Sequence, residues 1–161
     1  AGTMVLLIRR AQALMEAAGD DGDFDALCQQ LHRYQATLRT CFTLENFDNL
    51  IKNGRMRPIV GTLLRSLGIH IIADATAEGT IHVADKARGV GKTYRAITAL
   101  MKASKDCTDA EVVISHCENL EGAMALKRQI LADLPVKHVD LLSCRGLTSF
   151  YAMEKGLIVG Y

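Results

Sequence analysis

A short glycine-rich segment, Gly89-Val90-Gly91-Lys92-Thr93, is the first candidate for chemistry in this sequence. A Walker phosphate-binding loop needs a glycine, four residues and then Gly-Lys-Ser/Thr, so that successive backbone N–H groups surround the phosphates. Lys86 occupies the position of that first glycine. We therefore expect a tight strand-to-helix turn here. The alternative is an enzyme that binds a nucleotide or a phosphorylated substrate through Gly89 to Thr93.

The histidines and cysteines do not form the pattern of a metal or catalytic site. His116-Cys117-Glu118 matches the His-x-Glu of zinc deaminases, but no Pro-Cys-x-x-Cys follows it. His70 and His82 fall on neighbouring predicted strands, and two histidines alone are not a metal site. Five cysteines without a Cys-x-x-Cys pair are typical of reduced thiols. The sequence therefore predicts no metal and no cofactor.

Arg55 is the strongest candidate for contact with an anionic ligand. It follows Gly54, and glycine takes the positive φ that ends a helix and leaves the next residue on a turn. A guanidinium there suits a carboxylate or a phosphate, because its N–H groups match the oxygens of either group. A plain surface arginine is the alternative that the residues alone leave open.

The spacing of apolar residues predicts the elements that position these groups. Two helices are expected before residue 38, the second capped by Asp23. A strand over about 38–43 leads into a helix capped by Thr43 and ended by Gly54. A second short apolar helix follows, and then a hairpin with strands over 69–75 and 80–86 and Gly79 in its turn. Further elements are expected at about 92–104 (helix), 111–116 (strand), a helix ending before Pro135, and strands at 136–142 and 156–161.

The order of these elements and the bulk composition indicate one class of fold. Helices alternating with strands are typical of α/β layering, and the hairpin makes the sheet mixed. The chain has 161 residues, of which 49% are apolar, which excludes a disordered chain. A net charge of +1 with interspersed signs gives no support for a nucleic-acid partner. No apolar run is long enough for integral membrane association, and we expect a cytoplasmic protein.

The motifs from Asn53 onward resemble the DegV family, which includes the FakB-like fatty-acid-binding proteins. The family pattern is a short helix ending Gly-Gly-Arg-Ile, a variable apolar helix, a hairpin, and a Lys/Arg-Gly turn before another helix. The matching segments are Asn53-Gly54-Arg55-Met56, Leu63 to Ile72, and Ala87-Arg88-Gly89. The resemblance implies the α/β C-terminal domain of this family (EDD fold) over residues 39–161, with a mixed sheet of about six strands. Residues 1–38 are then expected to be the helical end of a truncated N-terminal domain, whose exposed faces suit a homodimer.

The resemblance also implies a function. DegV-like proteins bind a long-chain fatty acid and present it to a fatty acid kinase for phospholipid synthesis, without a catalytic residue of their own. Matched residue by residue, Arg55, Gly54 and Tyr151 are expected near the fatty acid head group. The acyl tail is expected along Ile59, Leu63, Leu64 and Leu67.

Two departures from the family pattern define a further alternative. Family members carry an additional N-terminal domain, whose Thr and Ser hydroxyls hold the carboxylate. The family's His-x-Gly-Pro-Gly loop is replaced by Ala152-Met153-Glu154-Lys155-Gly156, so that Ala152 stands where the histidine is expected and Tyr151 lies beside it. A phenol donates a hydrogen bond to a carboxylate but cannot become cationic. The alternative is a ligand-free DegV-like interaction or oligomerisation module.

Overall fold

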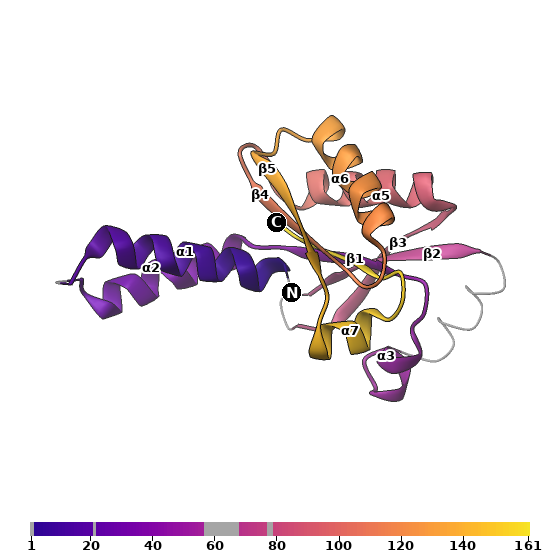
Figure 1. The fold of residues 1–161 in the computed structure, drawn as a ribbon, viewed down its shortest axis with the longest axis horizontal. Coiled ribbons are helices and arrows are strands. Elements are labelled where there is room, and N and C mark those ends of the chain that lie inside the picture. Colours follow the sequence, from indigo (N-terminus) through magenta and orange to yellow (C-terminus); the bar gives the residue numbers. More distant parts are fainter. Residues whose placement is uncertain (1, 21, 57–67, 77–78) are drawn as a thin grey trace.

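Six strands form one mixed sheet in the order β3-β2-β1-β6-β4-β5 (Figure 1). The computed structural model describes residues 2–20, 22–56, 68–76 and 79–161. β4 and β5 run parallel, whereas β1–β2, β1–β6, β2–β3 and β4–β6 are antiparallel pairs. The expected mixed α/β sheet is thereby confirmed. The strands are β1 (Thr40–Leu44), β2 (Ile69–Ala75), β3 (Ile81–Arg88), β4 (Glu111–His116), β5 (His138–Ser143) and β6 (Leu157–Gly160).

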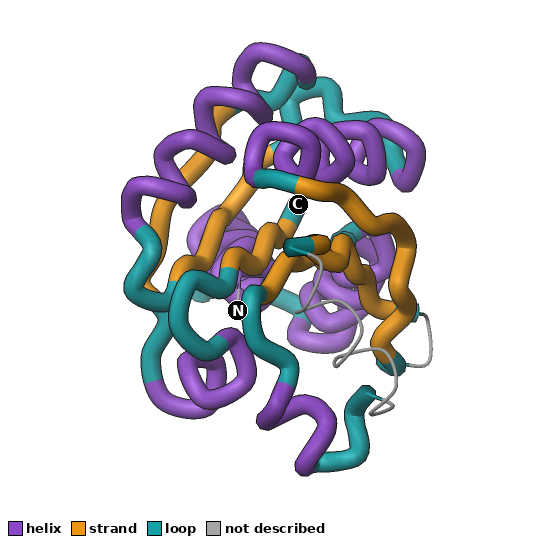
Figure 2. Tube along the Cα trace, turned by 90° about the vertical axis from the view of Figure 1, so that its right-hand side faces the viewer, coloured by secondary structure: helices purple, strands orange, loops and turns teal. Residues whose placement is uncertain are grey.

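Helices cover both faces of this sheet. Two long helices, α5 (Val90–Ser104) and α6 (Leu120–Asp133), lie on one face, and two short ones, α3 (Asp48–Lys52) and α7 (Gly146–Ala152), lie on the other (Figures 1 and 2). The remaining described helices, α1 (Gly2–Ala18) and α2 (Phe24–Thr37), pair as a hairpin that extends beyond the sheet (Figure 1). None of the helices in the described ranges is long and apolar enough to cross a membrane.

The first core fills the space between the sheet and α5 and α6. Alternate residues of each strand point into it, as the two-residue period of a strand requires. Fully buried side chains are worth about 1.5–3 kcal/mol each, so this cluster supplies most of the hydrophobic stabilisation. Its members include Ile72, Ile97, Met101, Val112, Ile114, Leu126, Ile130, Leu157 and Val159.

The second core lies on the opposite face, under α3 and α7, and is smaller. Partly exposed apolar side chains, among them Phe42, Tyr151 and Ile158, pack against its edge. This face of the sheet is therefore only partly covered by the described residues. The buried members are Leu44, Phe47, Leu50, Ile71, Ala73 and Ala152.

The expected helix cap at Thr43 is wrong. Thr43 lies inside β1, where it is paired with Ile72 of β2 and with Leu157 of β6. Because β1 is paired on both sides, the strand continues to Leu44, and α3 begins only at Asp48, whose N–H bonds Oδ1 of Asn46 at 2.8 Å. The expected loop between β5 and β6 is also incomplete, since it contains α7.

Other local predictions are confirmed. Asp23 caps α2, because its carboxylate accepts hydrogen bonds from the backbone of Asp25 and Ala26. Gly54 and Gly79 adopt positive φ values of 68° and 77°. The division of the chain into domains at residue 38 stays a prediction.

The first turn of α1 packs directly on the sheet. A Cβ atom added at Gly2 would stand 2.6 Å from the carbonyl oxygen of Val113 in β4. A Cβ added at Gly160 of β6 would collide with the backbone of Thr3 and Gly2. Glycine at both positions therefore allows the helix and strands to approach at backbone distance.

We predict that Gly2→Ala lowers the free energy of unfolding by about 1–3 kcal/mol, the usual cost of overpacking. Gly91→Ala is the matched control, because a Cβ there meets nothing within 4 Å. Alanine is the better helix former, so the control should be neutral or stabilising by about 0.5–1 kcal/mol. Urea denaturation of the two variants measures both changes, and equal stability of the variants would contradict the close approach.

Candidate functional site

A pocket of about 410 Å³ opens beside the second core, where three separate segments meet. The end of α3, the turn between β2 and β3, and α7 supply its walls. The three residues expected at a head group, Gly54, Arg55 and Tyr151, all line it. The sequence did not indicate the other lining residues, which are Leu50, Gly79, Thr80, Ile81 and Leu147.

Arg55 owes its position to the way α3 ends. The N–H of Arg55 bonds the carbonyl of Leu50 at 2.8 Å, and the N–H of Gly54 bonds that of Ile51 at 3.0 Å. With Gly54 at positive φ, these two bonds form a Schellman motif. The backbone of Arg55 is therefore fixed, while its side chain is exposed at the pocket.

Tyr151 is held by α7. Its half-buried ring packs against the second core and makes an edge-to-face contact with Phe150, with ring centroids 5.1 Å apart. The side-chain amide of Asn49 in α3 donates a hydrogen bond of 2.6 Å to the carbonyl oxygen of Phe150. This bond joins the helix before Arg55 to the helix that carries Tyr151, and so holds the backbones of both residues beside one pocket.

The composition of the pocket suits an amphipathic anion. Leu50, Ile81 and Leu147 provide an apolar wall, and Leu147 is 72% exposed, so apolar surface is accessible. The guanidinium of Arg55 and the phenol of Tyr151 are donors for a carboxylate or phosphate. An apolar wall with a few convergent polar groups is the usual form of a small-molecule site.

The residues expected along an acyl tail, Ile59, Leu63, Leu64 and Leu67, lie outside the described residues. Their role stays a prediction.

The glycine-rich segment forms the tight turn that was expected. Gly89, with φ of 83°, precedes α5 directly. The hydroxyl of Thr93, which is 1% exposed, donates to the carbonyl of Gly89 at 3.0 Å. In a Walker loop this hydroxyl would serve a magnesium ion, whereas here it is engaged by the first turn of the helix.

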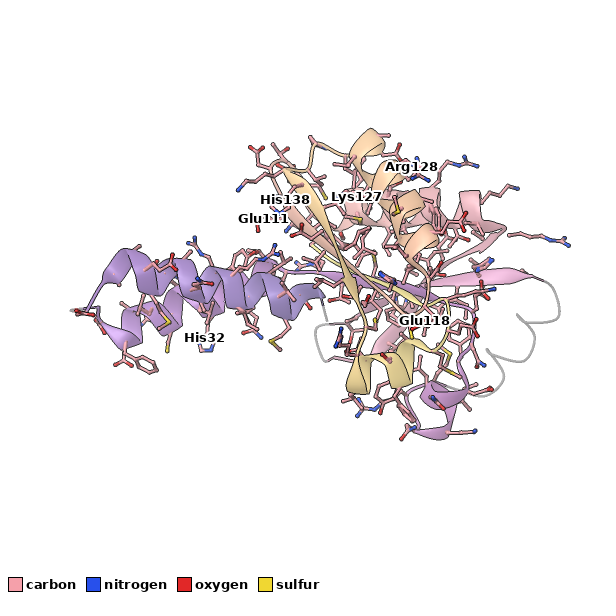
Figure 3. The ribbon with its side chains drawn as sticks, viewed as in Figure 1. His32, Glu111, Glu118, Lys127, Arg128 and His138 are labelled. Carbon is pink, nitrogen blue, oxygen red and sulfur yellow. The ribbon has the colours of Figure 1, made fainter. Side chains whose placement is uncertain are left out.

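The histidines are dispersed over the fold. Figure 3 shows His32 on the α1–α2 hairpin and His138 on the sheet. His70 is paired with Ala87 and His82 with Asp74, so the two lie at opposite ends of the β2–β3 hairpin. Within the described ranges, no group of three His, Cys, Asp or Glu side chains is arranged to hold a metal ion.

A second pocket, of about 450 Å³, lies between the α1–α2 hairpin and the sheet, and its charged groups are engaged within the protein. Arg9 bonds Asp140 at 2.6 Å, which holds the pKa of that carboxyl below its usual range. Lys105 donates to the carbonyl of Thr37 at 3.3 Å, and burial lowers the pKa of its amine. Arg10, which also lines this pocket, lies over the ring of Tyr34 at 5.8 Å. Because Arg9 and Lys105 are engaged within the protein, this pocket is a poorer anion site than the one at Arg55.

Comparison with known proteins decides the family. The family model described as an uncharacterised protein family, DegV, matches residues 3–157. The chain belongs to the DegV family. A DegV domain-containing protein of Streptococcus gordonii is 30% identical over 161 residues, and one of Streptococcus pneumoniae (strain R6) is 32% identical over 162. Each match covers 99% of this chain and 56% of the relative, so the chain spans about half the length of these DegV proteins.

Two solved DegV-type structures share the fold and contain a lipid. The Streptococcus pneumoniae Fatty Acid Kinase (Fak) B3 protein loaded with linoleic acid is 30% identical, with a TM-score of 0.89 over 99% of this chain and 56% of that one. A DegV family protein from Eubacterium eligens loaded with heptadecanoic acid is 25% identical, with a TM-score of 0.88 over 98% and 55%.

We predict that Asn49→Ala separates α3 from α7 and lowers the free energy of unfolding by about 0.5–1.5 kcal/mol, the usual net contribution of one hydrogen bond. Lys52→Ala, an exposed residue of the same helix, should stay within about 0.5 kcal/mol of the parent. Thermal or urea unfolding measures both. Equal effects of the two substitutions would show that the bond to Phe150 does not hold α3 and α7 together.

Proposed function

We propose that this DegV chain binds a long-chain fatty acid as a carrier, with the carboxylate at Arg55 and Tyr151 and the acyl chain along the second core. The observation that carries the proposal is the pocket itself. One cation, one phenol and several apolar side chains from three separate segments meet there. Its volume of about 410 Å³ falls within the range usual for small-molecule sites.

The lipid-loaded relatives support the same ligand class. Their names record linoleic acid and heptadecanoic acid, which share a carboxylate and a long hydrocarbon chain. The ligand of this chain is therefore proposed by similarity of fold and sequence together with the chemistry of its own pocket.

The two parts of such a ligand contribute differently to binding. Each buried methylene contributes about 0.8 kcal/mol, so the acyl chain supplies most of the affinity. The charged hydrogen bonds at Arg55 contribute about 1.5–3 kcal/mol and determine which end of the ligand faces the turn.

We further propose that the bound acid is presented to a fatty acid kinase, and that the chain itself is not catalytic. The name of the Fak B3 relative supports a kinase partner. Arg55 is exposed, so a carboxylate bound there lies where a second protein can reach it. The transfer of a phosphoryl group then belongs to the kinase, and phospholipid synthesis in the cytoplasm is the proposed setting.

The experiment is a titration of the purified, delipidated chain with oleate, followed by calorimetry below the concentration at which oleate forms micelles. We expect Arg55→Ala to raise the Kd roughly 10- to 100-fold, because a charged hydrogen bond is lost. Tyr151→Phe should raise it several-fold, because a neutral hydrogen bond is lost. Mass spectrometry of an organic extract of the native protein should find the same class of lipid, depleted in Arg55→Ala.

Arg128→Ala is the matched control. It removes an equal charge from an exposed position on α6, on the opposite face of the sheet (Figure 3). An equal loss of affinity in both arginine variants would refute a carboxylate at Arg55. Absence of any lipid, together with no uptake of oleate, would favour the ligand-free interaction module.

A further inference from the structure

Cys117 and Cys144 each follow directly after one of the two parallel strands. β4 ends at His116 and β5 at Ser143, and these two residues are paired in the register of the sheet. The N–H of Cys144 bonds the carbonyl of His116 at 2.7 Å, which is the parallel-ladder bond of that pair. Cys117 and Cys144 are the next residues along the two chains, so they follow the paired ends of the two strands side by side.

The two thiols also lie on the same face of the sheet. Val112 and Ile114 of β4 and Val139 of β5 point into the first core. By the two-residue period of a strand, positions 117 and 144 face the other way. Both cysteines are half-buried and pack against the second core, in agreement with that period.

The spacing of the sheet brings these thiols within reach of a covalent bond. Neighbouring strands lie about 4.7–4.9 Å apart, and a disulfide joins residues whose Cα atoms are about 4.4–6.8 Å apart. The backbone of both residues is held, since the N–H of Cys144 bonds His116 and the N–H of Cys117 bonds the carbonyl of Gly156 at 3.0 Å, so rotation of the side chains supplies most of the movement.

The other cysteines are less suited to react with a dissolved disulfide. Cys41 and Cys107 are 0% and 4% exposed within the first core. Burial raises the pKa of both thiols, as it also raises that of Cys144, so it is the greater exposure of Cys117 and Cys144 that distinguishes this pair. Cys28 lies on α2, in the hairpin beyond the sheet.

We propose that Cys117 and Cys144 are a modification site, a dithiol that closes to a reversible disulfide by exchange with a small disulfide such as oxidised glutathione. One thiolate attacks a sulfur of glutathione disulfide, forms a mixed disulfide and releases one glutathione. The second thiolate then attacks the protein sulfur and releases the second glutathione. Two protein thiols are oxidised, one glutathione disulfide is reduced, and the two protons remain with the two glutathione thiols.

The resulting disulfide would be easy to reduce. The Cβ atoms of a disulfide are about 3.5–4.5 Å apart, closer than side chains on neighbouring strands normally lie. The strain of drawing them together makes the bond more easily reduced, as in disulfides that respond to redox conditions. The dithiol is thus open under reducing conditions and closes under oxidising ones.

Formation of the disulfide would constrain the N-terminal end of α7. Arg145 is the N-cap of this helix, and Leu147 and Tyr151 on it line the pocket. β5 leads directly into α7 (Figure 1), and Glu118, the residue after Cys117, lies in the connection from β4 to α6 (Figure 3). A bond between the two cysteines therefore ties the first residues before α7 to the end of β4, whatever occupies the pocket.

The test is to equilibrate the purified chain in glutathione buffers of increasing oxidised fraction, block free thiols, and map peptides without reduction. We expect a peptide pair joined through Cys117 and Cys144, lighter by two hydrogens, which dithiothreitol separates. Hydrogen exchange of the amides of α7 should slow on oxidation. Cys117→Ser and Cys144→Ser should each abolish the linked pair, and Cys28→Ser, the control, should retain it.

Three results would overturn the proposal. One is the absence of the linked pair at every glutathione ratio, a second is pairing of either cysteine with a different one, and a third is mixed glutathione adducts alone. Circular dichroism checks that the serine variants are folded. If a serine variant is unfolded, the peptide map of the parent chain still tests the proposal, because it needs no substitution.

Discussion

Burial of both faces of the sheet is the constraint on which the rest of this structure depends. β1 lies inside the sheet and carries apolar side chains on both faces, with Cys41 in the first core and Leu44 in the second, so both faces must be covered. Two long helices bury the larger cluster on one face, and two short helices cover the other face only in part. The pocket at Arg55 lies on the less covered face, where apolar side chains and polar turns reach the surface together.

Local hydrogen bonds give that site its rigidity. A Schellman motif fixes the backbone of Arg55, and the bond from Asn49 to Phe150 fixes α3 against α7. Each of these features depends on one particular residue, Gly54 for the Schellman motif and Asn49 for the bond between the helices. Because the backbone of Arg55 is already fixed, only its side chain has to be ordered when a ligand binds, which reduces the entropy lost on binding.

The sequence predicted those features that depend on local patterns. β2 and β4 have the predicted bounds, because apolar alternation and the Gly79 turn are local signals.

α7 was missed because seven residues give a weak period, although Leu147, Phe150 and Tyr151 have helical spacing. The cap at Thr43 failed because pairing on both sides of β1 outweighs the capping preference of threonine. The pocket, and the position of Cys117 beside Cys144 at the ends of β4 and β5, arise from segments distant in sequence, which periodicity does not relate.

The close approach of Gly2 to Gly160 joins α1, the first described helix, to β6, the last described strand. Tyr161 lies next to this contact and exchanges two backbone hydrogen bonds with Arg39, just before β1 (Figure 1). During synthesis, α1 therefore cannot complete its packing on the sheet until β6 has left the ribosome, so the apolar residues of its first turns stay uncovered while the rest of the sheet is made.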